Sequence, residues 1–293
     1  MTKTTLETID WVLIAAGGLV ILAAAVRWRL NSSLHPGRRD FLRHSPLRAN
    51  SLGLMGPWVC IAGTLLGISA GPMLAPWFAA SLPPDLLKSW QSLFTTELTA
   101  VFNTILGLLV AGAMFARGLK GFGIGRRKLG YELAVALAGW LAALCLTGVI
   151  VFATEAFLRH YRPDYHPPEH GVFLALKDPA TPTWMRVFTI TGTLLLVPIG
   201  EEVLFRGILQ TAIQRLIPVR YGSFQHRWAS IIIVSALFGF FHSTPQFIPA
   251  LIALAILLGY LYERTGSLVV PIIIHILFNG KSLLFDYLAR TYL

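Results

Sequence analysis

Long runs of apolar residues, each close to the length of a membrane-crossing helix, constrain this chain more than any other feature. Most of them approach the ~20 residues that a helix needs to cross a bilayer. Apolar residues make up 55% of the 293-residue chain and charged residues only 13%, whereas soluble domains carry about 25% charged residues. The pattern predicts an all-α, polytopic membrane helix bundle with about eight transmembrane helices. The blocks lie at 11–26, 52–80 (with two interrupting prolines), 98–116, 131–153, 187–213, 228–242, 249–262 and 268–288.

The formal charge of +10 is carried mainly by short loops between the apolar blocks. Basic loops of this kind face the cytoplasm, which predicts that residues 27–48, 117–128 and 215–227 are cytoplasmic and that both termini lie outside. No stretch interleaves basic and aromatic residues as single-strand binders require, so nucleic acid is not an expected partner. The expected partner of these charges is the lipid bilayer.

A polar segment from 154 to 184 divides the apolar blocks into two groups of four. It carries five prolines, four acidic residues and three histidines, which is typical of an extramembrane loop. We therefore expect a four-span region at 1–153, a loop at 154–184 and a second four-span region at 185–293. The segment His166–His170 matches the inverted zinc motif H-x-x-E-H, but two consecutive prolines inside it exclude the helix that this motif needs.

The deepest ionisable residues all fall in the second four-span region. A charge at the centre of a membrane helix costs at least ~2.5–3.5 kcal/mol, so such residues are rare and usually functional. Four other acids, Glu97, Glu132, Glu263 and Asp286, lie near block ends, where contact with headgroups explains them. The deep residues are Glu201, Glu202, Arg206, His242 and His275.

Helical spacing adds geometry to this set. Glu202 and Arg206 are four residues apart, the spacing of an ion pair within one helix. Glu201 is turned about 100° away from Glu202 and remains free to face a partner. His275 with Asn279, and Phe238 with His242, repeat the four-residue spacing.

Two hydrolytic chemistries fit these residues. A carboxylate beside a histidine can deprotonate water, while a second histidine and an asparagine donate hydrogen bonds to an oxyanion. Alternatively, Glu201, His242 and His275 hold Zn²⁺, which activates the water itself. No serine or cysteine stands out as a nucleophile, and both cysteines lie inside apolar blocks. A structural ion network and a proton or ion pathway are the competing explanations.

Three motifs in this region resemble those of the CPBP family of intramembrane proteases, also called the CAAX-protease and bacteriocin-processing or Abi family. The resemblance covers about 185–290, and it implies an Rce1-like bundle with a membrane-embedded site. It further implies that Glu201 and His242 activate water, that His275 and Asn279 stabilise the oxyanion, and that Glu202, Arg206 and Phe238 support them. The family has been described both as metalloproteases and as glutamate-type proteases. The motifs read Glu201-Glu202-Val-Leu-Phe-Arg206, Phe238-Gly-Phe-Phe-His242 and His275-Ile-Leu-Phe-Asn279.

We therefore predict a multi-pass intramembrane endopeptidase in a bacterial plasma membrane. Its substrate is expected to be a membrane-associated peptide or protein, with CAAX-type C-terminal or propeptide processing as the implied reaction. Two alternatives stay open at this point. One is a proton- or ion-coupled transporter, and the other is a non-proteolytic Abi or bacteriocin-immunity protein that uses the same polar cluster.

Overall fold

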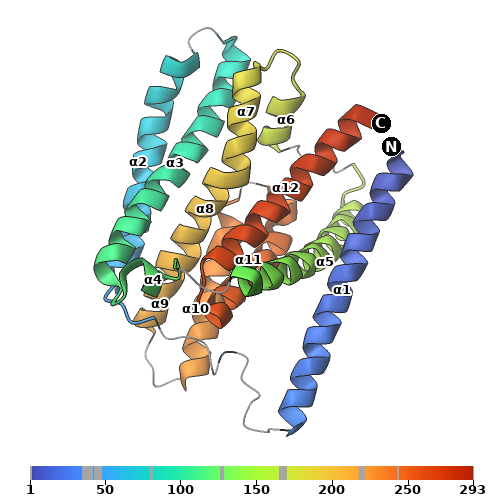
Figure 1. Cartoon of the computed structure of the whole chain (residues 1–293). Helices are drawn as coiled ribbons and strands as arrows, with labels where there is room; N and C mark the ends of the chain where they lie inside the picture. Colours follow the sequence, from blue (N-terminus) through green and yellow to red (C-terminus); the bar gives the residue numbers. More distant parts are fainter. Residues whose placement is uncertain are drawn as a thin grey trace.

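The structure is a computed structural model of the chain that describes residues 2–34, 42, 48–79, 82–125, 129–164, 170–217, 222–242 and 244–292 (Figure 1). Apart from one isolated bridge between Asn50 and Phe115, these residues form helices and turns. In the described ranges, seven helical segments are long and apolar enough to cross a membrane, and a shorter apolar helix at 227–240 adds an eighth. The prediction of an all-α, multi-pass membrane protein with about eight helices is confirmed.

Helices α2 (Met55–Ala79) and α3 (Pro84–Met114) form a tightly packed antiparallel pair. The face of α2 that is buried against α3 consists of small residues at intervals of about four, which lets two membrane helices approach closely. At Gly67 a β-carbon would lie 2.1 Å from the Thr99 hydroxyl oxygen, so a larger residue cannot replace this glycine without a shift. The interruption predicted at two prolines is wrong, because α2 continues through both of them.

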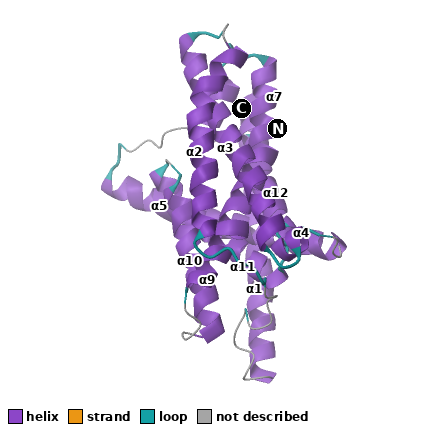
Figure 2. Ribbon diagram, turned by 90° about the vertical axis from the view of Figure 1, so that its left-hand side faces the viewer, coloured by secondary structure: helices purple, strands orange, loops and turns teal. Residues whose placement is uncertain are grey.

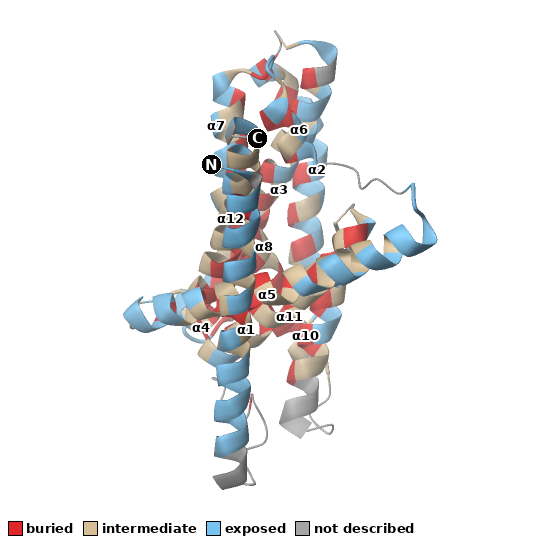
Figure 3. Cartoon of the chain, turned by 90° about the vertical axis from the view of Figure 1, so that its right-hand side faces the viewer, coloured by how far each residue is buried: buried red, intermediate tan, exposed pale blue. Residues whose placement is uncertain are grey.

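Helix α5 (Leu129–Tyr161) crosses the other long helices at a steep angle (Figures 1 and 3). Helix α1 (Lys3–Leu34) packs along α5, and only 6% of its most apolar window is buried. Most of α1 is therefore left to face lipid. Because α5 continues to Tyr161, the membrane helix extends eight residues into the predicted 154–184 loop.

Residues Thr183–Leu216 form one continuous apolar helix of 34 residues that carries both deep glutamates and Arg206. Helices α3 and α12 (Val269–Tyr292) pack against its middle. Two π-helical stretches, in which the backbone is wound more loosely than in an α-helix, interrupt it. The pieces are α7 (Thr183–Thr191), π-helical η2 (Gly192–Leu196), α8 (Val197–Glu202), π-helical η3 (Val203–Gln210) and α9 (Thr211–Leu216).

Helices α10 (Gly222–Phe240) and α11 (Ile248–Thr265) form a second antiparallel pair, joined through the short 3₁₀ helix η5 (Pro245–Phe247). Helix α11 ends at Gly266, whose φ of 63° is a left-handed conformation that closes a helix without strain in glycine. Figure 2 shows that almost the whole described chain is helix, with loops confined to the helix ends. The two termini lie close together at one end of the molecule (Figure 1).

One group of buried residues lies where α5, α11 and α12 cross, and a larger one joins α2, α3 and α4 to η3 and the end of α11, whereas the outer faces of the bundle are exposed (Figure 3). Large apolar side chains such as Trp77, which is 84% exposed, cover those outer faces. In an integral membrane protein this exposed apolar surface contacts lipid. Parts of the predicted basic loops, at 35–41, 43–47, 126–128 and 218–221, lie outside the described residues, and the topology of these loops stays a prediction.

The polar segment between α5 and α7 contains the short helix α6 (Gly171–Lys177), which packs against α3. Arg186 orders the connection between α6 and α7, because its guanidinium donates to the backbone carbonyls of Leu176, Asp178 and Thr181 at 3.2, 2.8 and 3.0 Å. Of the inverted zinc motif, residues 166–169 lie outside the described residues. His170 caps α6 instead, accepting a hydrogen bond from the Val172 amide at 3.3 Å.

Candidate active site

Glu202 is the centre of a buried polar cluster between the Thr183–Leu216 helix and α12. Its Oε1 accepts from Arg206 Nη1 at 2.9 Å, which confirms the predicted ion pair, and lies 2.9 Å from His275 Nδ1. All three side chains are buried. A buried carboxylate held by a guanidinium and an imidazole is fixed in orientation, because each bond is charge-assisted and directional. One oxygen, Glu202 Oε2, is buried without a hydrogen-bond partner among the described residues.

Arg206 has further partners that keep its charge inside the bundle. Its Nη2 donates to the Ala255 carbonyl on α11 at 3.4 Å, and its guanidinium carbon lies 4.6 Å from the centre of the Phe238 ring on α10. A guanidinium over an aromatic face is stabilised by the ring quadrupole. Arg206 therefore connects the glutamate helix to both α10 and α11.

Glu201 differs from Glu202 in being accessible. Its side chain is 23% exposed, and its Oε2 lies 3.8 Å from His275 Nε2. Because Glu202 engages His275 through Nδ1, the atom that His275 can offer to a reactant is Nε2. Glu201 and His275 Nε2 thus face the same space, as expected from the 100° between the two glutamates.

The π-helical stretch η2 explains how Asn279 is positioned. In an α-helix the Val197 amide would donate to the Thr193 carbonyl, four residues before it. In η2 it donates to Gly192 instead, five residues before it. The Thr193 carbonyl accepts from Asn279 Nδ2 at 2.9 Å, which anchors α12 to the glutamate helix. The second Nδ2 proton of Asn279 remains for another acceptor.

His242 lies just beyond the end of α10, in a turn, and not on the membrane helix where the sequence places it. A proline disfavours the helical conformation of the residue before it. Pro245 has this effect on Thr244, two residues after His242, so the chain leaves the helix near this point. The imidazole Nδ1 lies 2.7 Å from the Phe238 carbonyl, and its ring centre 4.8 Å from the Phe238 ring. Phe238 also contacts the rings of His275 and Phe205, so the end of α10 reaches the level of the glutamates.

The structure brings Glu201 and His275 together but leaves His242 apart from both. No ion pair joins His242 to a carboxylate in the described part of the chain, and no three His, Cys, Asp or Glu residues there converge as metal ligands do. The Glu202–His275 contact is of the kind that orients a metal-binding imidazole. With only two of the three predicted ligands in reach of each other, however, the donors in this conformation do not form a zinc site.

Three buried carboxylates were missed because the sequence places them at block ends. The interpretation of Glu97, Glu132 and Glu263 as residues at the headgroups is wrong, because all three are buried. The Glu97 carboxyl on α3 packs against Gly192, at the start of η2, where a β-carbon would lie 1.9 Å from its Oε1. Its Oε2 has no hydrogen-bond partner among the described residues. The apolar blocks alone do not show where helix ends are covered by other helices.

Glu263 on α11 is the centre of a second polar cluster. Gln210 and Gln214 donate to its Oε1 at 3.0 and 2.6 Å, and Arg48 donates to the same oxygen. Arg227 Nη1 lies 3.9 Å from Oε2. Burial opposes the charge of Arg48, but Glu263 and Tyr262 together outweigh this effect and raise the pKa of Arg48 above its usual value. Both carboxylate oxygens are therefore matched by donors or cations.

The start of α6 also lies near the candidate site. Desolvation, with a smaller contribution from the nearby His242 imidazole, lowers the pKa of His170 below its usual value, although the His170 side chain keeps solvent contact. A nearby imidazole disfavours protonation of His170 because two like charges repel each other. His170 thus lies in the surroundings of His242. The sequence analysis had placed His170 in a loop away from the candidate site.

The fold and the cluster together define a multi-pass membrane protein with a carboxylate–imidazole centre inside its helix bundle. Residues 182–280 match the family model described as type II CAAX prenyl endopeptidase Rce1-like. This match covers 99 of the 293 residues and agrees with the resemblance stated from the three motifs. No curated protein and no solved structure matches the chain.

Proposed function

We propose that the chain is an intramembrane endopeptidase of a bacterial plasma membrane in which Glu201 activates the water that attacks the peptide bond. The observation that supports this proposal most directly is the pairing of an accessible carboxylate with an immobilised imidazole. Glu201 Oε2 lies 3.8 Å from His275 Nε2, and His275 is held from behind by buried Glu202. A purely structural network would bury both carboxylates.

In the first step Glu201 takes a proton from water as the water oxygen attacks the scissile carbonyl carbon. If His242 Nδ1 donates to the Phe238 carbonyl, its Nε2 is an acceptor. It would orient the same water once the turn that carries His242 moves toward Glu201. The free Nδ2 proton of Asn279 and Nε2 of protonated His275 stabilise the negative oxygen of the tetrahedral intermediate. Glu201 then returns the proton to the leaving nitrogen as the C–N bond breaks, which yields a carboxylate and an amine.

Glu202 and Arg206 position the catalytic residues and do not contact the reacting atoms. Glu202 fixes the His275 ring, and Arg206 neutralises Glu202. The substrate is a membrane-associated peptide or protein, and the implied reaction is C-terminal CAAX-type or propeptide processing. Whether a metal takes part is decided by the experiment below.

The test compares wild type with Glu201→Gln on a library of quenched fluorogenic peptides in detergent, with and without a zinc chelator. Glu155→Gln, at a partly exposed carboxylate on α5, is the matched control. We expect Glu201→Gln to lower kcat/KM by about 10²–10⁴ and Glu155→Gln to leave it unchanged. Equal cleavage by wild type and Glu201→Gln would remove Glu201 from the mechanism.

The remaining arms separate the competing functions. Loss of cleavage on chelation would assign the chemistry to a metal, and full activity in metal-free protein would assign it to the carboxylate. Proton- or ion-driven flux in liposomes without peptide cleavage would favour a transporter. A biological effect that survives Glu201→Ala would favour a non-proteolytic protein.

A further inference from the structure

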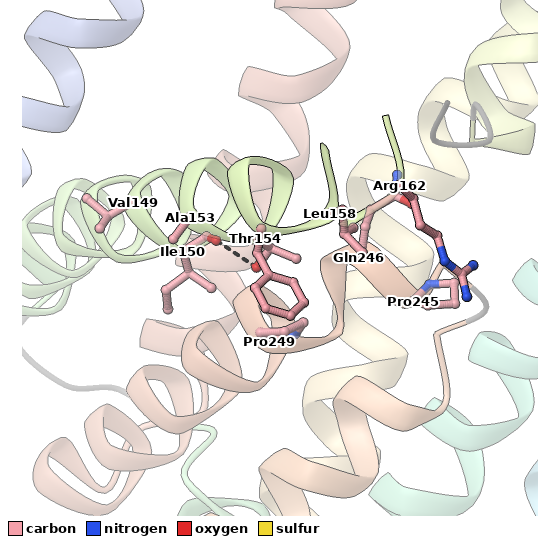
Figure 4. Close-up of a pocket in the computed structure, with 10 residues that line it drawn as sticks. Val149, Ile150, Ala153, Thr154, Leu158, Arg162, Pro245, Gln246 and Pro249 are labelled. Atoms are coloured by element: carbon pink, nitrogen blue, oxygen red, sulfur yellow. Dashed lines mark hydrogen bonds between the residues drawn. The ribbon is translucent and has the colours of Figure 1, made fainter. Parts of the chain in front are cut away.

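An open groove of about 680 Å³ lies between the second half of α5 and the start of α11 (Figure 4). One wall is a stripe along α5 that includes Val149, Ile150 and Ala153, which lie within about one helical turn of each other. The opposite wall is Pro245, Gln246 and Pro249, from η5 and the first turn of α11. The residues of this second wall come directly after the turn that carries His242 in the chain.

The groove is apolar along its length and basic at one end. Arg162, the first residue after α5, lines that end, and its side chain is exposed. Arg159, three residues earlier, lies 3.6 Å from Glu155 in an ion pair, whereas Arg162 forms no ion pair with the described residues. The only other polar lining comes from Thr154, whose hydroxyl donates to the Ile150 carbonyl, and from Gln246, which is buried.

An apolar channel that ends at a cation matches a molecule with an acyl chain and an anionic head. Basic pockets between membrane helices bind anionic headgroups, and a cation near an anionic lipid surface is worth about 1 kcal/mol. A zwitterionic lipid has the same acyl chain but a headgroup without net charge. Arg162 should therefore favour the anionic lipid over the zwitterionic one. The groove is also open and not enclosed, as access from the bilayer requires.

We propose that this groove binds an anionic phospholipid, with an acyl chain along α5 and its phosphate at Arg162, and that occupancy holds the turn with His242 in its active position. The second part rests on the proposed function, because it assigns His242 a role in catalysis. The physical link is short. Pro245 lines the groove three residues after His242, and a 3.0 Å hydrogen bond from the Phe247 amide to the Thr244 carbonyl holds the 3₁₀ turn that begins at Pro245.

Binding is tested by native mass spectrometry of the detergent-solubilised chain titrated with phosphatidylglycerol or with phosphatidylcholine of the same acyl chains. We expect wild type to prefer phosphatidylglycerol by about fivefold, the equivalent of one cation–anion contact, and Arg162→Gln to abolish the preference. Ala153→Phe should fill the groove and weaken binding of both lipids. Arg159→Gln and Ala156→Phe, on α5 but outside the groove, are the matched controls.

Activity is tested with the same variants in nanodiscs of phosphatidylcholine alone or with phosphatidylglycerol. We expect phosphatidylglycerol to raise the rate of peptide cleavage by wild type and by Arg159→Gln. The rate of cleavage by Arg162→Gln should be the same in both kinds of nanodisc. Equal binding of both lipids, or an unaltered preference in Arg162→Gln, would overturn the proposal. So would unchanged lipid binding with a raised KM for peptide in Ala153→Phe, which would make the groove a peptide site. Lipid preference without cleavage in any sample would instead overturn the proposed function.

Discussion

Glu202 and Glu263 are both fully buried glutamates in the same bundle, yet their surroundings differ in one respect. Around Glu263, two guanidinium groups and two amides meet both oxygens, and the carboxylate itself is buried. Around Glu202, one guanidinium and one imidazole share a single oxygen, the other oxygen has no partner among the described residues, and neighbouring Glu201 is accessible. The comparison teaches that saturation of hydrogen bonds, more than burial, separates a structural ion cluster from a reactive one.

The sharpest way to break this comparison is to remove Glu263. Glu263→Ala leaves Arg48 and Arg227 in the bundle without their common anion, which should lower the free energy of unfolding by about 3–5 kcal/mol. Thermal unfolding in detergent measures the loss. The matched variant Glu201→Ala should change stability far less, because its carboxylate is partly solvated. Equal losses in the two variants would mean that the clusters do not differ as the geometry indicates.

Arg206→Ala should have the next largest effect. It leaves buried Glu202 with His275 as its remaining charged partner, so we expect a loss near the lower end of the same range, about 3 kcal/mol. Because the guanidinium also packs on Phe238, Arg206→Lys keeps the charge and loses the planar contact, and it should recover part of the stability. An Arg206→Ala protein that unfolds at the wild-type temperature would contradict the assigned ion pair.

A smaller effect is expected where Glu97 packs against the start of η2. Gly192→Ala places a methyl group at the position of the Glu97 carboxyl, and overpacking of this kind costs about 1–3 kcal/mol. The second substitution Glu97→Ala removes the obstacle. The double variant should therefore be more stable than Gly192→Ala alone, as measured by thermal unfolding. Additive losses would show that the two residues do not contact each other.

The smallest effect is expected at His170. His170→Ala removes the cap of α6 and should cost about 1 kcal/mol. Since the pKa of His170 is lowered in the folded protein, the neutral ring contributes fully above the unfolded pKa of about 6.5, and this contribution is lost as the pH falls through the folded pKa. His170→Asn keeps a capping oxygen that does not titrate, so its stability should not show this acid-side loss. A wild-type pH profile that matches that of His170→Asn would exclude the assignment.

Sequence spacing was sufficient for features that lie within one helix. The Glu202–Arg206 pair and the 100° between Glu201 and Glu202 follow from helical geometry alone, and both are present. The number of spans followed equally directly from apolar length. What could not be predicted depends on contacts between distant helices. Glu263 is buried because Arg48 and Arg227 meet it from loops and helices far away in the sequence.

The position of His242 shows the same limit. The apolar block ends at this residue, and a straight helix through it would not bring the histidine to the level of Glu201. The structure ends α10 at Phe240 and turns the chain there, and the ring of Phe238, in the last turn of α10, contacts His275. Local turn chemistry at Thr244-Pro245 was visible in the sequence, but the contact between Phe238 and a histidine on a distant helix was not.

The loose winding at η2 makes the register of the reactive helix depend on chain length. Each residue turns an α-helix by about 100°, so deleting Leu194 or Leu195 would rotate the part of the helix after the deletion relative to the part before it. Pro198 would then lie four residues after Thr193. Because proline has no N–H and its ring clashes with the carbonyl four residues before it, regular α-helical winding would not be restored there without a kink. The number of residues in η2 therefore sets the direction in which Glu201 points. We expect insertions or deletions in this stretch to be more damaging than most substitutions in it.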